Sequence, residues 1–197
     1  MPRVSQEHTD ARRRQILAGA RRCFAANGFH ATSMQDLLGE MGLSAGAFYR
    51  YFTGKDALIN AIAEESLDRV TDELAEYFAQ EPLPELPELL AGVPAARITP
   101  LLDQETRDVL MQIWSESMRS PELRERVQDG FATLLAMLAG MMRRYRDRGD
   151  LPADADPEAC ARAALGLIQG YVLQRTVFGL DAPEPFTTGL RTLLSPR

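Results

Sequence analysis

Residues 32–55 read TSMQDLLGEMGLSAGAFYRYFTGK, and this stretch decides the fold. Ser33 is a good N-cap residue before a short apolar-patterned run, which Gly42 can end because glycine adopts a positive φ. Ser44 then caps a second run that extends to about Phe52. Two short helices joined by a glycine turn are typical of a helix-turn-helix.

A longer helix is predicted just before this motif, over residues 10–27. Its apolar side chains recur at helical spacing, and Asn27-Gly28 provides a left-handed stop. The apolar positions of the motif can pack with this helix as a small core. On the first helix they are Ile16, Ala20, Cys23 and Phe24, and in the motif they are Leu37, Leu38, Met41, Phe48 and Phe52.

The rest of the chain also reads as helices, and the sequence shows no convincing strand or repeat. These helices are predicted at about 55–80, 84–90, 103–119, 121–148, 157–178 and 185–194. We therefore expect an all-α protein. An N-terminal three-helix domain over residues 1–54 would carry the helix-turn-helix, and a larger helical domain would span residues 55–197.

Charge is distributed unevenly along the 197 residues, although the net charge is −6. Residues 1–60 hold eight Lys or Arg against five acidic residues, whereas the remainder holds 14 against 23. The split suggests a small part that meets phosphates and a larger part that does not.

Several protein classes are disfavoured by the composition. No apolar run approaches the ~18–20 residues that span a bilayer, and the N-terminus lacks the apolar core of a secretory signal. Cys23 and Cys160 are expected to be reduced thiols, so the sequence predicts a cytoplasmic protein. We find no catalytic constellation, metal-ligand spacing or phosphate-binding loop, and therefore expect no enzyme, cofactor or metal.

The motif resembles the DNA-binding domain of TetR-family transcriptional regulators. The resemblance covers about 45 residues in order and spacing. It rests on Asn27-Gly28-Phe29, Thr32-Ser33, Asp36-Leu37-Leu38, the run from Gly42 to Phe52, and Lys55. Ala45 departs from the polar residue common in the family, and Tyr51 stands where His is common. The family implies a repressor that a small-molecule effector releases from a palindromic operator.

Contacts to double-stranded DNA are predicted from chemistry together with this resemblance. Tyr49 and Tyr51 have hydroxyls that can reach phosphates, and Lys55 adds a cation at a helix N-terminus. Arg50 is the long polar side chain expected to read a base edge. The full predicted set is Thr32, Ser33, Ser44, Ala45, Gly46, Ala47, Tyr49, Arg50, Tyr51 and Lys55.

Two candidate contacts have plain structural alternatives. Tyr49 could be a half-buried structural residue. Arg12, Arg13 and Arg14 could contact the DNA backbone or form a solvated helix face. His30 is expected to be structural or exposed rather than functional.

The family resemblance implies a homodimer formed by the last two helices. Small residues recur along residues 157–178 and would let a partner helix approach closely, although packing within one subunit is the alternative. The predicted interface residues are Ala163, Gly166, Leu167, Gly170, Tyr171, Gln174, Leu190 and Leu193.

The resemblance also implies an effector site among the middle helices. The few inward charges there suggest an apolar or aromatic ligand, although plain core is the favoured interpretation of each candidate taken singly. The candidates are Met111, Trp114, Met118, Phe131, Leu135, Met141, Tyr145, Gln169 and Phe178. Two other functions remain open: an architectural DNA-binding protein without an effector, and a helical protein-interaction module.

Overall fold

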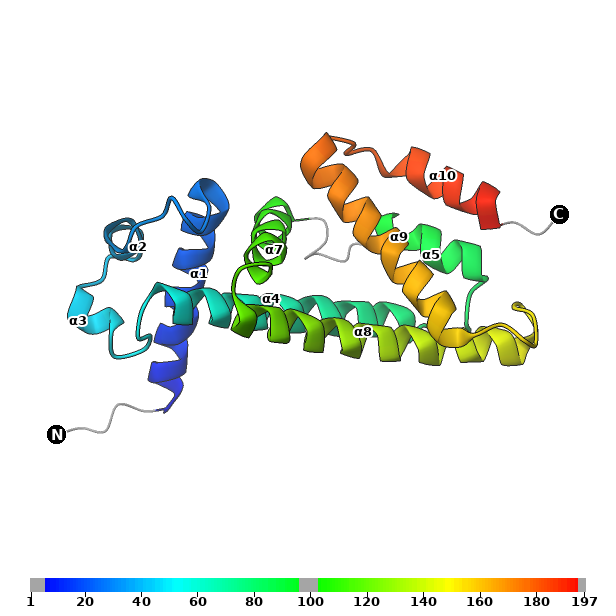
Figure 1. Cartoon of the computed structure of the whole chain (residues 1–197), viewed down its shortest axis with the longest axis horizontal. Helices are drawn as coiled ribbons and strands as arrows, with labels where there is room; N and C mark the ends of the chain where they lie inside the picture. Colours follow the sequence, from blue (N-terminus) through cyan, green and yellow to red (C-terminus); the bar gives the residue numbers. More distant parts are fainter. Residues whose placement is uncertain (1–5, 96–102, 195–197) are drawn as a thin grey trace. The chain divides into compact units, whose positions relative to one another are not determined.

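The computed structural model describes residues 6–95 and 103–194, and these form helices joined by loops, without strands (Figure 1). The helices are α1 (Gln6–Asn27), α2 (Met34–Met41), α3 (Ala45–Phe48), α4 (Lys55–Phe78), α5 (Leu86–Ala95), α7 (Gln104–Ser117), α8 (Pro121–Arg148), α9 (Pro157–Phe178) and α10 (Pro183–Leu194). The predicted all-α class is confirmed. Within this described part, no helix is both long and apolar enough to cross a membrane.

The described residues group into two compact units that interleave along the chain. The first unit contains the residues up to Ser66 together with Asp108–Arg126, and the second contains Leu67–Arg107 together with the residues from Val127 onward. The predicted domains, 1–54 and 55–197, follow the chain order instead. Three helices, α4, α7 and α8, contain residues of both units.

The core of the first unit forms where α1 packs with α2 and the segment after it. The predicted α1 face is buried, and so are Leu37, Met41, Phe48 and Phe52, whereas Leu38 is half-buried. The rings of Phe24 and Phe29 meet edge to face at 4.9 Å. The small core expected from the sequence is therefore confirmed.

In the second unit, two tyrosine hydroxyls hold the connection between α4 and α5. The Tyr77 hydroxyl donates to the Leu89 carbonyl at 2.9 Å, and the Tyr145 hydroxyl donates to the Pro84 carbonyl at 3.0 Å. Burial raises the pKa of Tyr145 to about 12, so this hydroxyl keeps its proton.

The second unit also packs α5 against α10, where Arg191 forms a bidentate pair with Glu88 at 2.8 and 3.0 Å.

Gly42 ends α2 in the left-handed conformation, with φ 61° and ψ 36°. A side chain at this φ costs about 1–2 kcal/mol, so Gly42→Ala should lower the free energy of unfolding by roughly 1 kcal/mol. Gly39 is the matched control because it lies inside α2, where an added Cβ would meet nothing within 4 Å. Gly39→Ala should stabilise the protein by up to about 1 kcal/mol. Urea denaturation followed by circular dichroism would measure both, and equal stability of Gly42→Ala and wild type would contradict the assignment.

Candidate functional site

The first helix of the motif is closed at its N-terminus by a reciprocal capping box. The Ser33 hydroxyl accepts from the Asp36 backbone N–H at 3.2 Å, and Asp36 Oδ2 accepts from the Ser33 N–H at 2.8 Å. The Ser33 hydroxyl also donates to Asp36 Oδ2 at 2.6 Å. These bonds satisfy N–H groups that a helix start leaves without partners.

The second helix of the motif is short and slim. Ser44 caps it by accepting from the Ala47 N–H at 3.3 Å, and α3 proper ends at Phe48. The expected helix through Phe52 is instead a helical turn followed by hydrogen-bonded turns. Their bonds run from Tyr51 N–H to the Phe48 carbonyl at 2.9 Å and from Phe52 N–H to the same carbonyl at 3.2 Å.

Burial separates the residues of this segment into an inner and an outer set. Phe48 and Phe52 are buried, and their rings lie 5.9 Å apart with 29° between planes. Tyr49 and Arg50 are exposed, and Ala47 and Tyr51 are half-buried. The first turn of α3 presents Ser44, Ala45 and Gly46 to solvent. The segment therefore offers a surface without bulky side chains, followed by one hydroxyl and one guanidinium.

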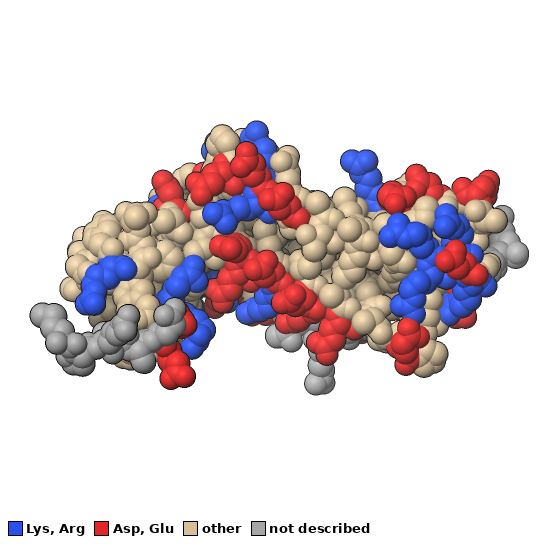
Figure 2. Space-filling view, turned by 90° about the horizontal axis from the view of Figure 1, so that it is seen from below, with Lys and Arg blue, Asp and Glu red and all other residues tan. Residues whose placement is uncertain are grey.

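Arg13 of α1 lies beside the end of this segment. Its guanidinium carbon is 5.4 Å from the centroid of the Phe52 ring, within the range of a cation–π contact. Figure 2 shows that the helix-turn-helix end, at the left, carries separate Lys or Arg side chains on a mainly uncharged surface. Arg13 and Arg50 are both exposed cations of this unit.

Two predicted DNA contacts have internal partners. The Thr32 side chain is only 1% exposed, and its hydroxyl donates to the Gly28 carbonyl at 2.7 Å. This hydroxyl therefore serves the loop before α2 in the structure, and its contact with phosphate stays a prediction. Lys55 donates from Nζ to the Thr32 carbonyl at 2.8 Å, which ties the start of α4 to the loop before α2. An ammonium has three N–H donors, so Lys55 keeps two for other acceptors.

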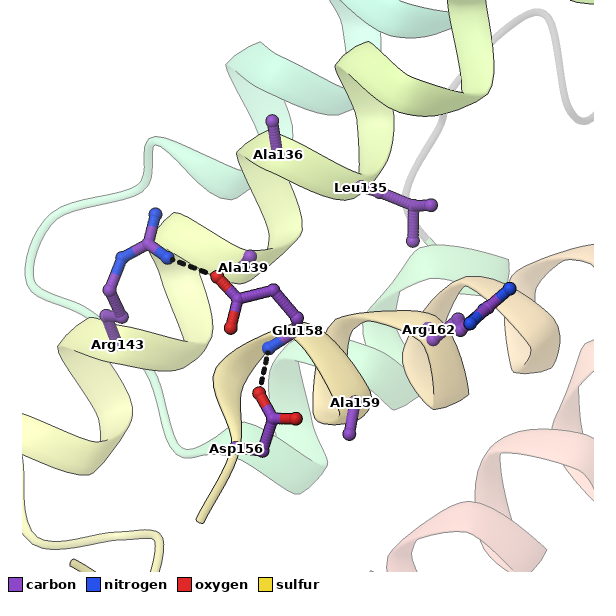
Figure 3. Close-up of a pocket in the computed structure, with 8 residues that line it drawn as sticks. All are labelled: Leu135, Ala136, Ala139, Arg143, Asp156, Glu158, Ala159 and Arg162. Atoms are coloured by element: carbon purple, nitrogen blue, oxygen red, sulfur yellow. Dashed lines mark hydrogen bonds and ion pairs between the residues drawn. The ribbon is translucent and has the colours of Figure 1, made fainter. Parts of the chain in front are cut away.

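The second unit contains a cavity of about 530 Å³ between α8 and the start of α9 (Figure 3). Arg143 of α8 and Glu158 of α9 reach toward each other and pair at 3.1 Å. The Glu158 N–H donates to Asp156 Oδ1 at 3.0 Å, and hydrogen bonding of this kind lowers the pKa of Asp156. The cavity is lined by Leu135, Ala136, Ala139, Arg143, Asp156, Glu158, Ala159 and Arg162. Leu135 alone among these belongs to the predicted effector residues.

The other predicted effector residues are spread over the two units. Met111, Trp114 and Met118 belong to the first unit, and Met118 is 69% exposed. The other five belong to the second unit and differ widely in exposure. Met141 and Tyr145 are buried, Phe131 and Gln169 are half-buried, and Phe178 is 62% exposed.

The predicted interface residues divide in a similar way. Two of them are buried within the chain: Tyr171, whose ring lies 5.1 Å from that of Phe186, and Leu190. The others are exposed or half-buried, namely Ala163, Gly166, Leu167, Gly170, Gln174 and Leu193. The predicted set leaves out Leu173 and Val177, which are exposed apolar residues on α9. Helical spacing from Gly166 and Gly170 was the signal that could have found them.

Family models match both parts of the chain. The model "Bacterial regulatory proteins, tetR family" matches residues 16–62, and "BetI-type transcriptional repressor, C-terminal" matches residues 95–187. The Escherichia coli K12 regulator UidR is 27% identical over 191 residues, which cover 96% of this chain and 94% of UidR. Salmonella enterica GusR has a solved structure that is 30% identical, covers 98% of this chain and 97% of its own, and superposes with a TM-score of 0.77.

The chain belongs to the TetR family of transcriptional regulators. It is therefore a DNA-binding transcriptional regulator and not an enzyme. A Saccharomonospora viridis regulator in complex with choline is 22% identical, covers 94% of this chain and 96% of its own, and has a TM-score of 0.76. That likeness is one of fold.

No group of three or more potential metal-ligating side chains is found among the described residues of the regulator.

The capping box makes the stability of the regulator sensitive to acid. Hydrogen bonds from the Ser33 hydroxyl and N–H hold the pKa of Asp36 below its usual value of ~4. Because the folded pKa is the lower one, this stabilisation is present above the unfolded value and is lost as the pH falls through the folded value. Ser33→Ala should therefore make stability fall less steeply below about pH 4.

Urea denaturation at a series of pH values between 3 and 7 would measure this change. NMR titration of the Asp36 carboxyl would report its pKa directly. Ser115→Ala, an exposed change on α7, is the control. Parallel pH profiles for wild type and Ser33→Ala would contradict the prediction.

Proposed function

We propose that the regulator is a repressor that binds a palindromic operator as a homodimer and is released by a small-molecule effector. The observation that carries the DNA-binding part is the outer surface of the 44–52 segment. Its slim first turn lets the backbone approach a major groove, while the buried Phe48 and Phe52 fix its orientation. The repressor sense is supported by the description of the C-terminal family model.

The exposed residues suggest separate roles in this complex. Tyr49 and Tyr51 would donate hydrogen bonds from their hydroxyls to phosphates, and Lys55 would add its remaining N–H donors. Small side chains would allow the backbone to approach the DNA closely at Ser33, Ser44, Ala45, Gly46 and Ala47. An alanine methyl would lie against a thymine methyl where one is present. Arg50 would read a guanine through O6 and N7, a contact worth ~1–3 kcal/mol.

The homodimer is proposed from the two apolar faces of α9. One face is buried within the chain, and the opposite face exposes small residues at Ala163 and Gly166 and apolar ones at Leu173 and Val177. An exposed face with several apolar side chains commonly marks a site of protein–protein contact. A second copy of α9, flanked by the exposed Leu193 of α10, would cover the second face.

An apolar or aromatic effector is proposed to bind in the second unit. The α8–α9 cavity is the candidate, because its volume lies within the range of small-molecule sites. Leu135 and three alanines would meet the apolar part of a ligand, whereas Arg143, Asp156, Glu158 and Arg162 place charges around the same cavity. Fold neighbours include the choline-bound regulator, which supports small-molecule control without fixing the ligand class. Effector and operator would compete through a coupling of ~1–3 kcal/mol.

Arg50→Ala and Tyr49→Phe should weaken DNA binding in two distinguishable ways. Operator sites would first be selected from random DNA with the purified protein, and Kd then measured by fluorescence anisotropy over a salt series. Arg50→Ala should cost ~1–3 kcal/mol per half-site and remove the preference at one base pair. Tyr49→Phe should weaken operator and random duplex by one common factor, at ~1 kcal/mol, because a phosphate contact carries no sequence information.

The wild-type protein provides the reference, since its log Kd should rise linearly with log salt concentration. The DNA-binding proposal fails if the wild type binds no duplex at low ionic strength. If Arg50→Ala keeps the wild-type base preference at every position, the role of Arg50 is wrong.

Val177→Asp should convert the homodimer into monomers. A carboxylate in the proposed apolar interface would be left uncompensated, at a cost of about 3 kcal/mol or more. Sedimentation equilibrium over a concentration series would measure the change. Ala79→Asp is the control, because Ala79 is exposed directly after α4. A wild-type protein that sediments as a monomer at tens of micromolar would contradict the interface.

A further inference from the structure

The loop between α1 and α2 sets the position of the DNA-binding motif. Gly28 ends α1 with φ +83°, its N–H donating to the Phe24 carbonyl at 2.8 Å. Phe29 then turns into the core and is 4% exposed. Because α2 begins at Met34, five residues after Phe29, and packs on α1, a shift of this loop would carry the motif with it.

A single side chain of α7 holds both sides of this turn. Gln112 Oε1 accepts from the Phe29 backbone N–H at 2.8 Å, and Gln112 Nε2 donates to the Phe24 carbonyl at 2.9 Å. The two ends of one amide thus fix the last turn of α1 relative to the first core residue of the loop. In Figure 1, α7 lies beside this end of α1.

A second contact of α7 lies one turn further along the same helix face. Glu116 Oε2 is 2.8 Å from His30 Nε2, but the His30 side chain is 75% exposed. An ion pair with such exposure contributes little. The attachment of the loop to α7 therefore depends mainly on Gln112, which is half-buried.

The contact of Gln112 matters because α7 contains residues of both compact units. Asp108–Arg126 belongs to the same compact unit as the helix-turn-helix, although α7 begins with residues of the second unit. A helix transmits rotation along its length because its backbone hydrogen bonds are continuous. Movement of the first residues of α7 would thus reach the loop through Gln112.

We propose that Gln112 is the positioning residue through which α7 sets the α1–α2 loop and, with it, the affinity for the operator. The proposal rests on the proposed function, since it concerns the same DNA-binding surface. Loss of the two hydrogen bonds leaves the charges and side chains of that surface in place. Only the orientation of the surface changes. Specific binding requires a correct orientation, whereas nonspecific phosphate binding does not.

Two substitutions separate the two hydrogen bonds. Gln112→Met removes both at similar side-chain length, whereas Gln112→Glu keeps an acceptor for the Phe29 N–H and loses the donor to the Phe24 carbonyl. Gln104→Met is the matched control, because Gln104 is exposed on the same helix. Each full-length variant would be titrated with the selected operator and with a random duplex, and hydrogen exchange would follow the Phe29 amide.

For Gln112→Met we expect the operator Kd to rise roughly tenfold, the random-duplex Kd to change less than twofold, and the Phe29 amide to exchange faster. Gln112→Glu should raise the operator Kd roughly threefold, and Gln104→Met should match wild type. A merely structural role would instead reduce the active fraction and weaken both duplexes by the same factor.

The inference is overturned if the variants lose operator and random-duplex binding in parallel, or if operator binding is unchanged while Phe29 exchanges faster. If Gln112→Met does not fold, the ratio of operator Kd to random-duplex Kd for Gln112→Glu tests the proposal instead. Failure of the wild type to bind any duplex would instead overturn the proposed function itself, so the two failures are distinguishable.

Discussion

The proposed DNA-binding surface depends on the burial of two phenylalanines behind a helix too short to be stable alone. Four residues form α3, whereas isolated helices shorter than ~12–15 residues are marginal in water. Phe48 is fully buried and Phe52 nearly so, and each contributes on the order of 2 kcal/mol by leaving water. The exposure of Tyr49 and Arg50 follows from this anchoring, since the backbone between two fixed rings cannot turn its outward residues inward.

Features that depend on near neighbours in the chain were predictable from the sequence. Ser33, Gly42 and Ser44 end or begin their helices as expected, because a cap involves only residues within one turn. The bounds of the longer helices were also close to those observed, since Pro and Gly mark them. The helix predicted over residues 44–52 tightens into turns after Phe48 while keeping its buried face.

Features that depend on distant residues were not predictable. The partner of Lys55 lies 23 residues away at Thr32, and Gln112 reaches back 83 residues to Phe29. Nothing in the local pattern distinguishes a lysine at a helix start that meets phosphate from one that meets a carbonyl. Apolar stripes have the same limit, because periodicity shows that Tyr171 is covered but not that Phe186 of the same chain covers it.

The small side chains of segment 44–52 also limit how many base pairs the proposed complex can contact directly. In the proposed complex, Ala45, Gly46 and Ala47 would lie at the groove, and Arg50 would be the long polar side chain that segment 44–52 offers to base edges. At ~1–3 kcal/mol per half-site, two copies supply about 2–6 kcal/mol, whereas specific binding typically exceeds nonspecific binding by ~4–10 kcal/mol. The remainder has to come from methyl contacts, from DNA shape at untouched positions and from correct spacing of two half-sites. All three require a rigid motif, because a surface with few base contacts discriminates only when its orientation on the duplex is fixed.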